Sequence, residues 1–148
     1  MLSQIGTLRE ISECCRTGRK LDASHSRWLA SALQKFLSHE CVSLDEALGL
    51  RFPRGGVPWW MEEAMRDRDA ALRQLVRKFC RDMSVRAQAQ YIVSRSRRYA
   101  ASAWRFDREK KDMPKEYFGT QKACLWQAFK SGAPMPISER RLRDLLAV

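Results

Sequence analysis

Apolar residues recur along the chain with the period of an α-helix. Between a few glycine and proline breaks they stand three or four residues apart, as on the buried face of a helix. No segment shows a convincing alternation of apolar and polar residues, the pattern of a half-buried strand. The spacing predicts seven helices, at about 3–16, 24–38, 43–48, 59–81, 84–111, 120–130 and 138–146. The predicted fold class is therefore all-α, a single compact domain of about six or seven helices.

Residues that start or stop helices flank several of these segments. Ser43 and Glu46 match a capping box, in which each side chain accepts a hydrogen bond from the other residue's backbone N–H. Gly49 is expected to end that short helix, and Pro58 to open the next one. Ser138 is expected to cap the last helix.

One charged residue interrupts the apolar face of the helix predicted at 59–81. That face carries Met61, Met65, Leu72, Val76 and Phe79. Arg68 falls on the same face. Because a buried guanidinium needs a partner, the pattern predicts either an internal ion pair for Arg68 or a stripe that reaches solvent midway.

The helix predicted at 84–111 is long and basic, with eight basic residues and two acidic ones. Its apolar stripe consists of Val85, Ala89, Ile92, Ser96, Tyr99, Ala103 and Phe106. At about 100° per residue, the opposite face carries Arg86, Arg97, Arg98, Trp104, Arg105 and Arg108. Acidic partners four residues away are nearly absent, so we expect these arginines to contact phosphates and Trp104 to stack on an unstacked base. The alternative is an ordinary solvated outer face.

Positive charge is concentrated beyond residue 50. The 148 residues include 28 Lys and Arg against 17 Asp and Glu, a net charge of +11. Residues 1–50 hold six basic and six acidic residues, whereas residues 51–148 hold 22 and 11. We expect a charge-neutral N-terminal helical packing region at 1–50 and a basic helical region at 51–148, together one domain. Such a surface attracts polyanions, although net charge also serves solubility alone.

The last two predicted helices form a hairpin that resembles a helix-turn-helix. The second of them presents Arg140, Arg141 and Arg143 outward. In a helix-turn-helix these side chains would reach base edges in the major groove, while the arginines of 84–111 would hold the backbone. A hairpin that serves packing alone is nearly as consistent with the long turn at 131–136. The predicted nucleic-acid-binding residues are Arg86, Arg97, Arg98, Trp104, Arg105, Arg108, Lys110, Lys111, Arg140, Arg141 and Arg143.

The chain shows no pattern of a catalytic, metal or cofactor site. Its five cysteines form no CxxC pair, and His25 and His39 have no obvious nucleophile beside them. The RGGV segment at 54–57 lacks the Lys-Ser/Thr that completes a phosphate-binding P-loop. We therefore expect no metal, no cofactor and no enzymatic activity. A site assembled from distant residues would not show in these patterns.

Membrane and export signals are also missing from the pattern. No apolar run approaches the ~20 residues of a spanning helix, and residues 1–10 lack the apolar core of a signal peptide. Unpaired cysteines are typical of a reducing compartment. A cytoplasmic protein without membrane contact is expected.

Three segments resemble a family of small basic bacterial proteins. They are SLDEALGL at 43–50, RRYAASAWRFDR at 97–108 and ISERRLRDLL at 137–146. The family has no assigned activity, and some of its members lie in prophage-like regions. The resemblance implies no functional residues, so the predicted site rests on charge and periodicity.

Charge and periodicity favour two functions. The first is a nucleic-acid-binding protein, for DNA in preference to RNA, that contacts phosphates through the basic helix and bases through the C-terminal hairpin. The alternative is a protein–protein interaction module, such as a phage-type inhibitor or adaptor, that docks on an acidic or nucleic-acid-handling partner. The same arginines would serve either function.

Overall fold

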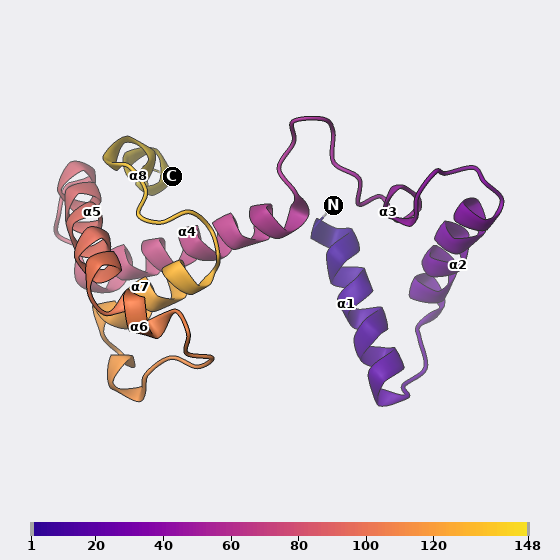
Figure 1. The fold of residues 1–148 in the computed structure, drawn as a ribbon, viewed down its shortest axis with the longest axis horizontal. Helices are drawn as coiled ribbons and strands as arrows, with labels where there is room; N and C mark the ends of the chain where they lie inside the picture. Colours follow the sequence, from indigo (N-terminus) through magenta and orange to yellow (C-terminus); the bar gives the residue numbers. More distant parts are fainter. Residues whose placement is uncertain (1, 148) are drawn as a thin grey trace. The chain divides into compact units, whose positions relative to one another are not determined.

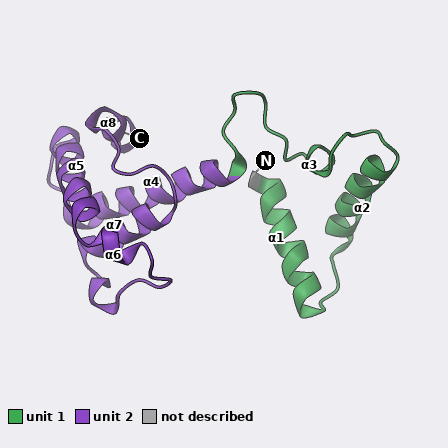
Figure 2. Cartoon of the chain, in the orientation of Figure 1, with its two compact units in different colours: residues 1–59 green, residues 60–148 purple. Residues whose placement is uncertain are grey.

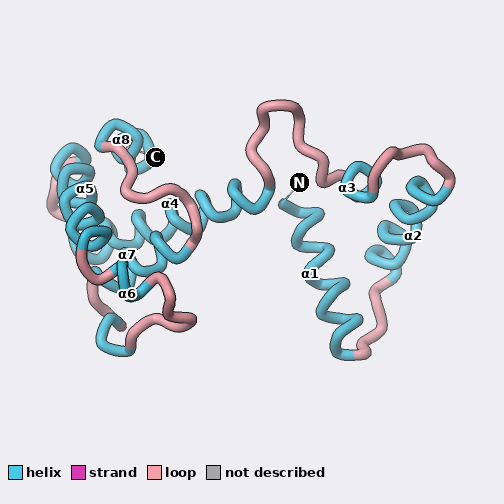
Figure 3. The backbone as a smooth tube through the Cα atoms, viewed as in Figure 1, coloured by secondary structure: helices cyan, strands magenta, loops and turns pink. Residues whose placement is uncertain are grey.

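The chain is helical throughout the described residues, as the computed structural model shows for residues 2–147 (Figure 1, Figure 3). The all-α prediction is therefore confirmed, and no strand occurs in this range. The helices are α1 (Leu2–Thr17), α2 (Ala23–Leu37), α3 (Leu44–Ala47), α4 (Trp59–Phe79), α5 (Val85–Ala101), α6 (Trp104–Asp107), the 3-10 helix η1 (Lys115–Tyr117), α7 (Gln121–Lys130) and α8 (Glu139–Leu146).

The chain divides into two compact units, residues 1–59 and residues 60–148 (Figure 2). This boundary follows Trp59, whereas the charge balance of the sequence changes near residue 50. In unit 1, α3 packs against α2, and the buried apolar side chains are Ile5, Ile11 and Ala32. Unit 2 holds 20 basic and 11 acidic residues, a net charge of +9. Most of the excess positive charge therefore belongs to unit 2.

Polar side chains cap several helices, as expected for α8. The hydroxyl of Ser138 accepts the backbone N–H of Arg141 at 3.3 Å. The capping box predicted at Ser43 is wrong, because the Ser43 hydroxyl makes no cap bond and interacts with the Asp45 carboxylate instead. Glu46 reaches one residue further back, where its carboxylate accepts the N–H of Val42 at 3.2 Å.

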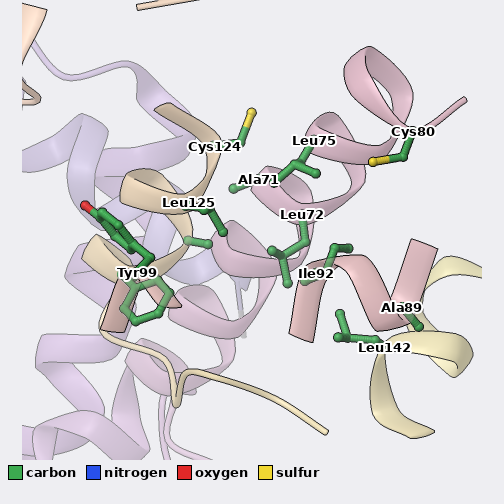
Figure 4. Close-up of a cluster of buried hydrophobic side chains, with 12 residues drawn as sticks. Ala71, Leu72, Leu75, Cys80, Ala89, Ile92, Tyr99, Cys124, Leu125 and Leu142 are labelled. Carbon is green, nitrogen blue, oxygen red and sulfur yellow. The ribbon is translucent and has the colours of Figure 1, made fainter. Parts of the chain in front are cut away.

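The core of unit 2 lies where α4, α5, α7 and α8 meet (Figure 4). Leu72 and Leu75 of α4, Ile92 of α5, Ala128 of α7 and Leu142 of α8 have no exposed surface. α8 packs along α5. α8 thus turns Leu142 and Leu145 inward and leaves its arginines exposed.

Arg68 is a buried charge with the ion pair that its position predicted. Only 3% of the residue is exposed. Its guanidinium donates to one carboxylate oxygen of Asp69 at 2.8 and 2.9 Å and to the backbone carbonyl of Pro134 at 3.2 Å. The side chain therefore links α4 to the segment between α7 and α8.

The prediction of one helix over 84–111 is wrong, because α5 ends at Ala101. Ser102 leaves the helical conformation, with φ −118° and ψ −101°, and its hydroxyl donates to the carbonyl of Arg98 at 2.7 Å. In a continuous helix, Tyr99 and Asp107 would stand about 12 Å apart along the axis. In the structure the Tyr99 hydroxyl donates to the Asp107 carboxylate at 2.8 Å, which requires the chain to turn between them.

The turn also changes which aromatic residues are buried. Phe106, predicted on the apolar stripe, is 73% exposed. Trp104, predicted among the arginines, is half-buried, and its ring centroid lies 5.2 Å from that of Phe129 and 6.0 Å from that of Tyr99. The placement of both residues was wrong because it assumed a helix that continued through Ser102.

Arg68→Ala tests the buried ion pair. The substitution leaves the Asp69 carboxylate and the Pro134 carbonyl without their donor, and we expect it to lower the free energy of unfolding by about 3 kcal/mol. Urea denaturation followed by circular dichroism measures the change. Arg66→Ala, an exposed position on the same helix, is the matched control and should change stability by less than about 0.5 kcal/mol. Equal effects of the two substitutions would contradict the assignment.

Candidate nucleic-acid interface

A buried carboxylate fixes the corner that follows α5. Asp107 is 2% exposed. One of its oxygens accepts the hydroxyls of Tyr99 and Tyr117, both at 2.8 Å, and the other accepts the Lys110 ammonium at 2.9 Å. The ammonium of Lys130 donates to the backbone carbonyls of Arg108 and Lys110. These bonds connect α5, α6, η1 and α7.

The ionisation of these groups follows from their surroundings. Burial alone would raise the pKa of Asp107, but the hydrogen bonds from Lys110, Tyr117 and Tyr99 together outweigh it, so the pKa lies below its usual value. Burial, and then the bond to Asp107, raises the pKa of Tyr117 to about 12 and that of Tyr99 well above its usual value. At neutral pH, Asp107 is therefore charged and both tyrosines remain donors.

Three cations line a cavity of about 370 Å³ between α5 and α7. Arg95 and Arg98 come from α5, one turn apart, and Lys122 comes from the first turn of α7. Tyr99, Ala103 and Leu125 supply apolar lining, and Ser102 and Gln121 complete it. No carboxylate lies within 4 Å of these three cations in the part of the chain that the structure describes, although Glu116 lines the adjoining cavity with Arg95 and Lys122.

Tyrosine rings position two of these cations. The Arg95 guanidinium carbon lies 5.1 Å from the centroid of the Tyr91 ring, and the Lys122 ammonium lies 5.2 Å from that of Tyr117. Both rings are themselves held, because Tyr91 donates to the side chain of Gln121 and Tyr117 donates to Asp107. An aromatic face attracts a cation without neutralising it, so the positive charge stays available to a ligand.

Most of the predicted binding residues are exposed and free of carboxylate partners. Over residues 2–147, no acidic side chain lies within 4 Å of the following eight: Arg86, Arg97, Arg98, Arg105, Lys111, Arg140, Arg141 and Arg143. Two of the predicted residues are paired. Arg108 lies 3.2 Å from Glu109, and Lys110 holds Asp107. The Trp104 ring packs on Phe129 and so contributes to the packing of unit 2.

The predicted residues do not form one helical face. Arg97 and Arg98 belong to α5, whereas Arg105 lies on α6 beyond the turn at Ser102. Within α5, Arg98 falls on the side of the cavity, together with Arg95. The continuous arginine face predicted for 84–111 is therefore divided at the turn.

The two C-terminal helices are present, and α8 places its arginines outward. Leu142 and Leu145 are buried, whereas Arg140, Arg141 and Arg143 are exposed. Residues 131–138 connect α7 to α8, a longer connection than the turn of three or four residues usual in a helix-turn-helix.

Sequence reasoning missed Arg95, Lys122 and Asp107. Arg95 falls near the apolar side of the helical projection, and Lys122 belongs to another helix, so neither was counted with the basic face. Asp107 could have been found, because continued helical spacing places this acidic residue beside the apolar stripe. A carboxylate at such a position needs hydrogen-bond donors, and Tyr99 and Tyr117 are such donors.

Potential metal-ligating side chains are not clustered in the described residues. These residues contain no group of three or more His, Cys, Asp or Glu side chains placed to hold a metal ion. All five cysteines are free thiols. No helix among residues 2–147 is both long and apolar enough to cross a bilayer.

Comparison with protein-family models, with curated proteins and with solved structures finds no match for this chain.

Asp107→Asn tests the corner. The amide has one acceptor oxygen where the carboxylate receives three donors, so we expect the free energy of unfolding at pH 7 to fall by about 2 kcal/mol. A carboxyl whose pKa is lowered by folding stabilises the fold above its usual pKa of about 4, and this contribution is lost as the pH falls through the lowered pKa. The difference between wild type and variant should therefore shrink below about pH 4. Asp112→Asn, at an exposed position, should show neither effect, and a D107N difference independent of pH would refute the role of the charge.

Proposed function

We propose that this protein binds DNA through the exposed arginines of unit 2. The observation that carries the proposal is the set of guanidinium groups on α5, α6 and α8 that have no carboxylate within 4 Å among residues 2–147. Phosphate oxygens are natural partners for such groups, because the planar guanidinium forms two parallel charge-assisted hydrogen bonds with them. Release of counterions from the DNA adds to the affinity.

The positions of the helices suggest a division of labour. Arg97, Arg98 and Arg105 contact the phosphate backbone and position the protein, whereas the arginines of α8 reach base edges and confer sequence preference. Support comes from the packing of α8 along α5, which keeps both groups of arginines within unit 2. The short α8, with its buried leucines and outward arginines, has the amphipathic pattern that a groove-reading helix needs.

Salt dependence tests whether phosphates are contacted. We expect the logarithm of the association constant for a random-sequence duplex to fall linearly with the logarithm of salt concentration, with a slope of about −4 or steeper for four or more phosphate contacts. The triple variant Arg97→Glu, Arg98→Glu, Arg105→Glu should lower the affinity for all sequences and make the slope shallower by about one unit for each phosphate that it no longer binds. Fluorescence anisotropy titrations between 50 and 200 mM salt, about the range over which such slopes are read, give both quantities.

A charge-matched control separates location from net charge. The variant Arg19→Glu, Lys20→Glu, Arg27→Glu makes the same change in unit 1, at exposed positions, and should keep nearly full affinity. A flat salt response of the wild type, or equal losses of affinity in the two triple variants, would refute the proposal. A flat response would favour an interaction with a protein partner.

Arg141→Ala tests base reading by α8. Selection of bound duplexes from a random library should yield a preferred sequence for the wild type. The variant should lose the preference at one or two positions, each worth about 1–3 kcal/mol of discrimination. A uniform loss of affinity without a change in the selected sequence would mean that Arg141 contacts only phosphate.

A further inference from the structure

The cavity between α5 and α7 differs from the rest of the basic surface. Arg97, Arg105 and the arginines of α8 are exposed on separate helices, whereas Arg95, Arg98 and Lys122 together line one open cavity of about 370 Å³. The three side chains that line it carry like charges, and in the described chain no carboxylate lies within 4 Å of them, although Glu116 lines the adjoining cavity. Such an arrangement is relieved when an anion binds among them.

The number of charges indicates what kind of anion fits. A phosphodiester carries one negative charge, whereas a phosphate monoester carries between 1.5 and 2 at neutral pH, about the value for phosphorylated side chains. Three unpaired cations therefore favour the monoester over an internal phosphate of a strand. Its three terminal oxygens can accept bonds from Arg95, Arg98 and Lys122 together.

The walls of the cavity allow for more than a phosphate. Its volume lies within the range of small-molecule sites, about 300–1,000 Å³, and exceeds what a phosphate group alone fills. Tyr99, Ala103 and Leu125 give the cavity an apolar part of its lining. A sugar or base attached to the phosphate would rest on this part of the lining.

Two of the three cationic heads, those of Arg95 and Lys122, are held in place before a ligand arrives. Arg95 lies over Tyr91, whose hydroxyl is bound to Gln121, and Lys122 lies over Tyr117, whose hydroxyl is bound to Asp107. Preorganised groups lose less conformational freedom on binding, which raises affinity. The first turn of α7 adds to the positive potential, because the Thr120 hydroxyl donates to the Tyr117 carbonyl and does not cap the helix.

From these observations we infer that the cavity lined by Arg95, Arg98 and Lys122 binds a phosphate monoester, the terminal phosphate of a DNA strand. The inference deepens the proposed function and rests on it for the source of the phosphate. The protein would then prefer DNA ends that carry a phosphate, and the arginines of α5, α6 and α8 would hold the adjoining duplex.

The test compares duplexes that differ only at their ends. The full-length protein is titrated with one duplex, labelled internally, that carries 5′-hydroxyl, 5′-phosphate or 3′-phosphate termini. We expect about tenfold tighter binding to one of the phosphorylated forms than to the hydroxyl form, and the favoured form identifies the end. The variant Arg95→Gln, Arg98→Gln, Lys122→Gln should abolish this ratio. Arg97→Gln, on the same helix outside the cavity, should weaken binding to all three duplexes and leave the ratio unchanged.

A mononucleotide tests the cavity independently of DNA binding. Adenosine 5′-monophosphate and adenosine are compared by chemical-shift titration of the wild type and the cavity variant, with circular dichroism to show that the variant is folded. A preference for the monophosphate that the cavity variant loses supports a phosphate-monoester site in the cavity. If no duplex binds, the DNA end as the source of that phosphate is overturned together with the proposed function, and a free nucleotide is the ligand. The inference is overturned if the three duplexes bind equally and the monophosphate is not preferred over adenosine. The proposed function is tested separately, by whether the duplexes bind at all.

Discussion

The architecture of unit 2 depends on one buried carboxylate. Asp107 receives hydrogen bonds from Tyr99, Tyr117 and Lys110, and these bonds fix the positions of α5, α6 and η1 relative to one another. A buried carboxylate with no donors would cost several kcal/mol, so the chain must bring the two tyrosine hydroxyls to it. This requirement ends α5 at Ala101 and turns the chain before α6. The Trp104 ring follows the turn and packs on Phe129, which adds apolar burial to the polar constraint.

The same corner also positions one of the cations of the cavity. The Tyr117 hydroxyl is bound to Asp107, and the ammonium of Lys122 lies over the Tyr117 ring. This contact holds the start of α7 at the cavity that Arg95 and Arg98 also line. Had the helix continued, the arginines on either side of Ser102 would have formed one stripe suited to a long backbone. The turn instead separates Arg105 on α6 from the arginines of α5, and α7 brings Lys122 to the cavity that Arg95 and Arg98 line. The fold thus offers one cavity lined by three cations, together with exposed arginines on α5, α6 and α8.

The sequence was sufficient to predict what depends on local pattern. Helical spacing located the main helices, the Ser138 cap followed from its position before an amphipathic segment, and the partner of Arg68 was required by its place on an apolar face. The end of α5 could not be predicted in this way, because the helix stops for contacts between Tyr99, Asp107 and Tyr117 that only the folded chain brings together. The cavity was missed for the same reason, since Arg95 and Lys122 belong to different helices. The sequence pattern misplaced both Phe106 and Trp104, because it continued the helical spacing of α5 beyond Ser102, where the chain leaves the helical conformation.

The arginine side-chain resonances provide the most direct test of the anion site. In ¹H–¹⁵N spectra, the Nε–H groups of arginine report contact with phosphate oxygens individually, and a chain of 148 residues is well suited to the method. On addition of a 5′- or 3′-phosphorylated duplex, we predict large shifts for Arg95 and Arg98, with smaller shifts for Arg97 and Arg141. Shifts confined to the arginines of unit 1, or none at Arg95 and Arg98 with either duplex, would contradict the claim that the Asp107 corner builds an anion site.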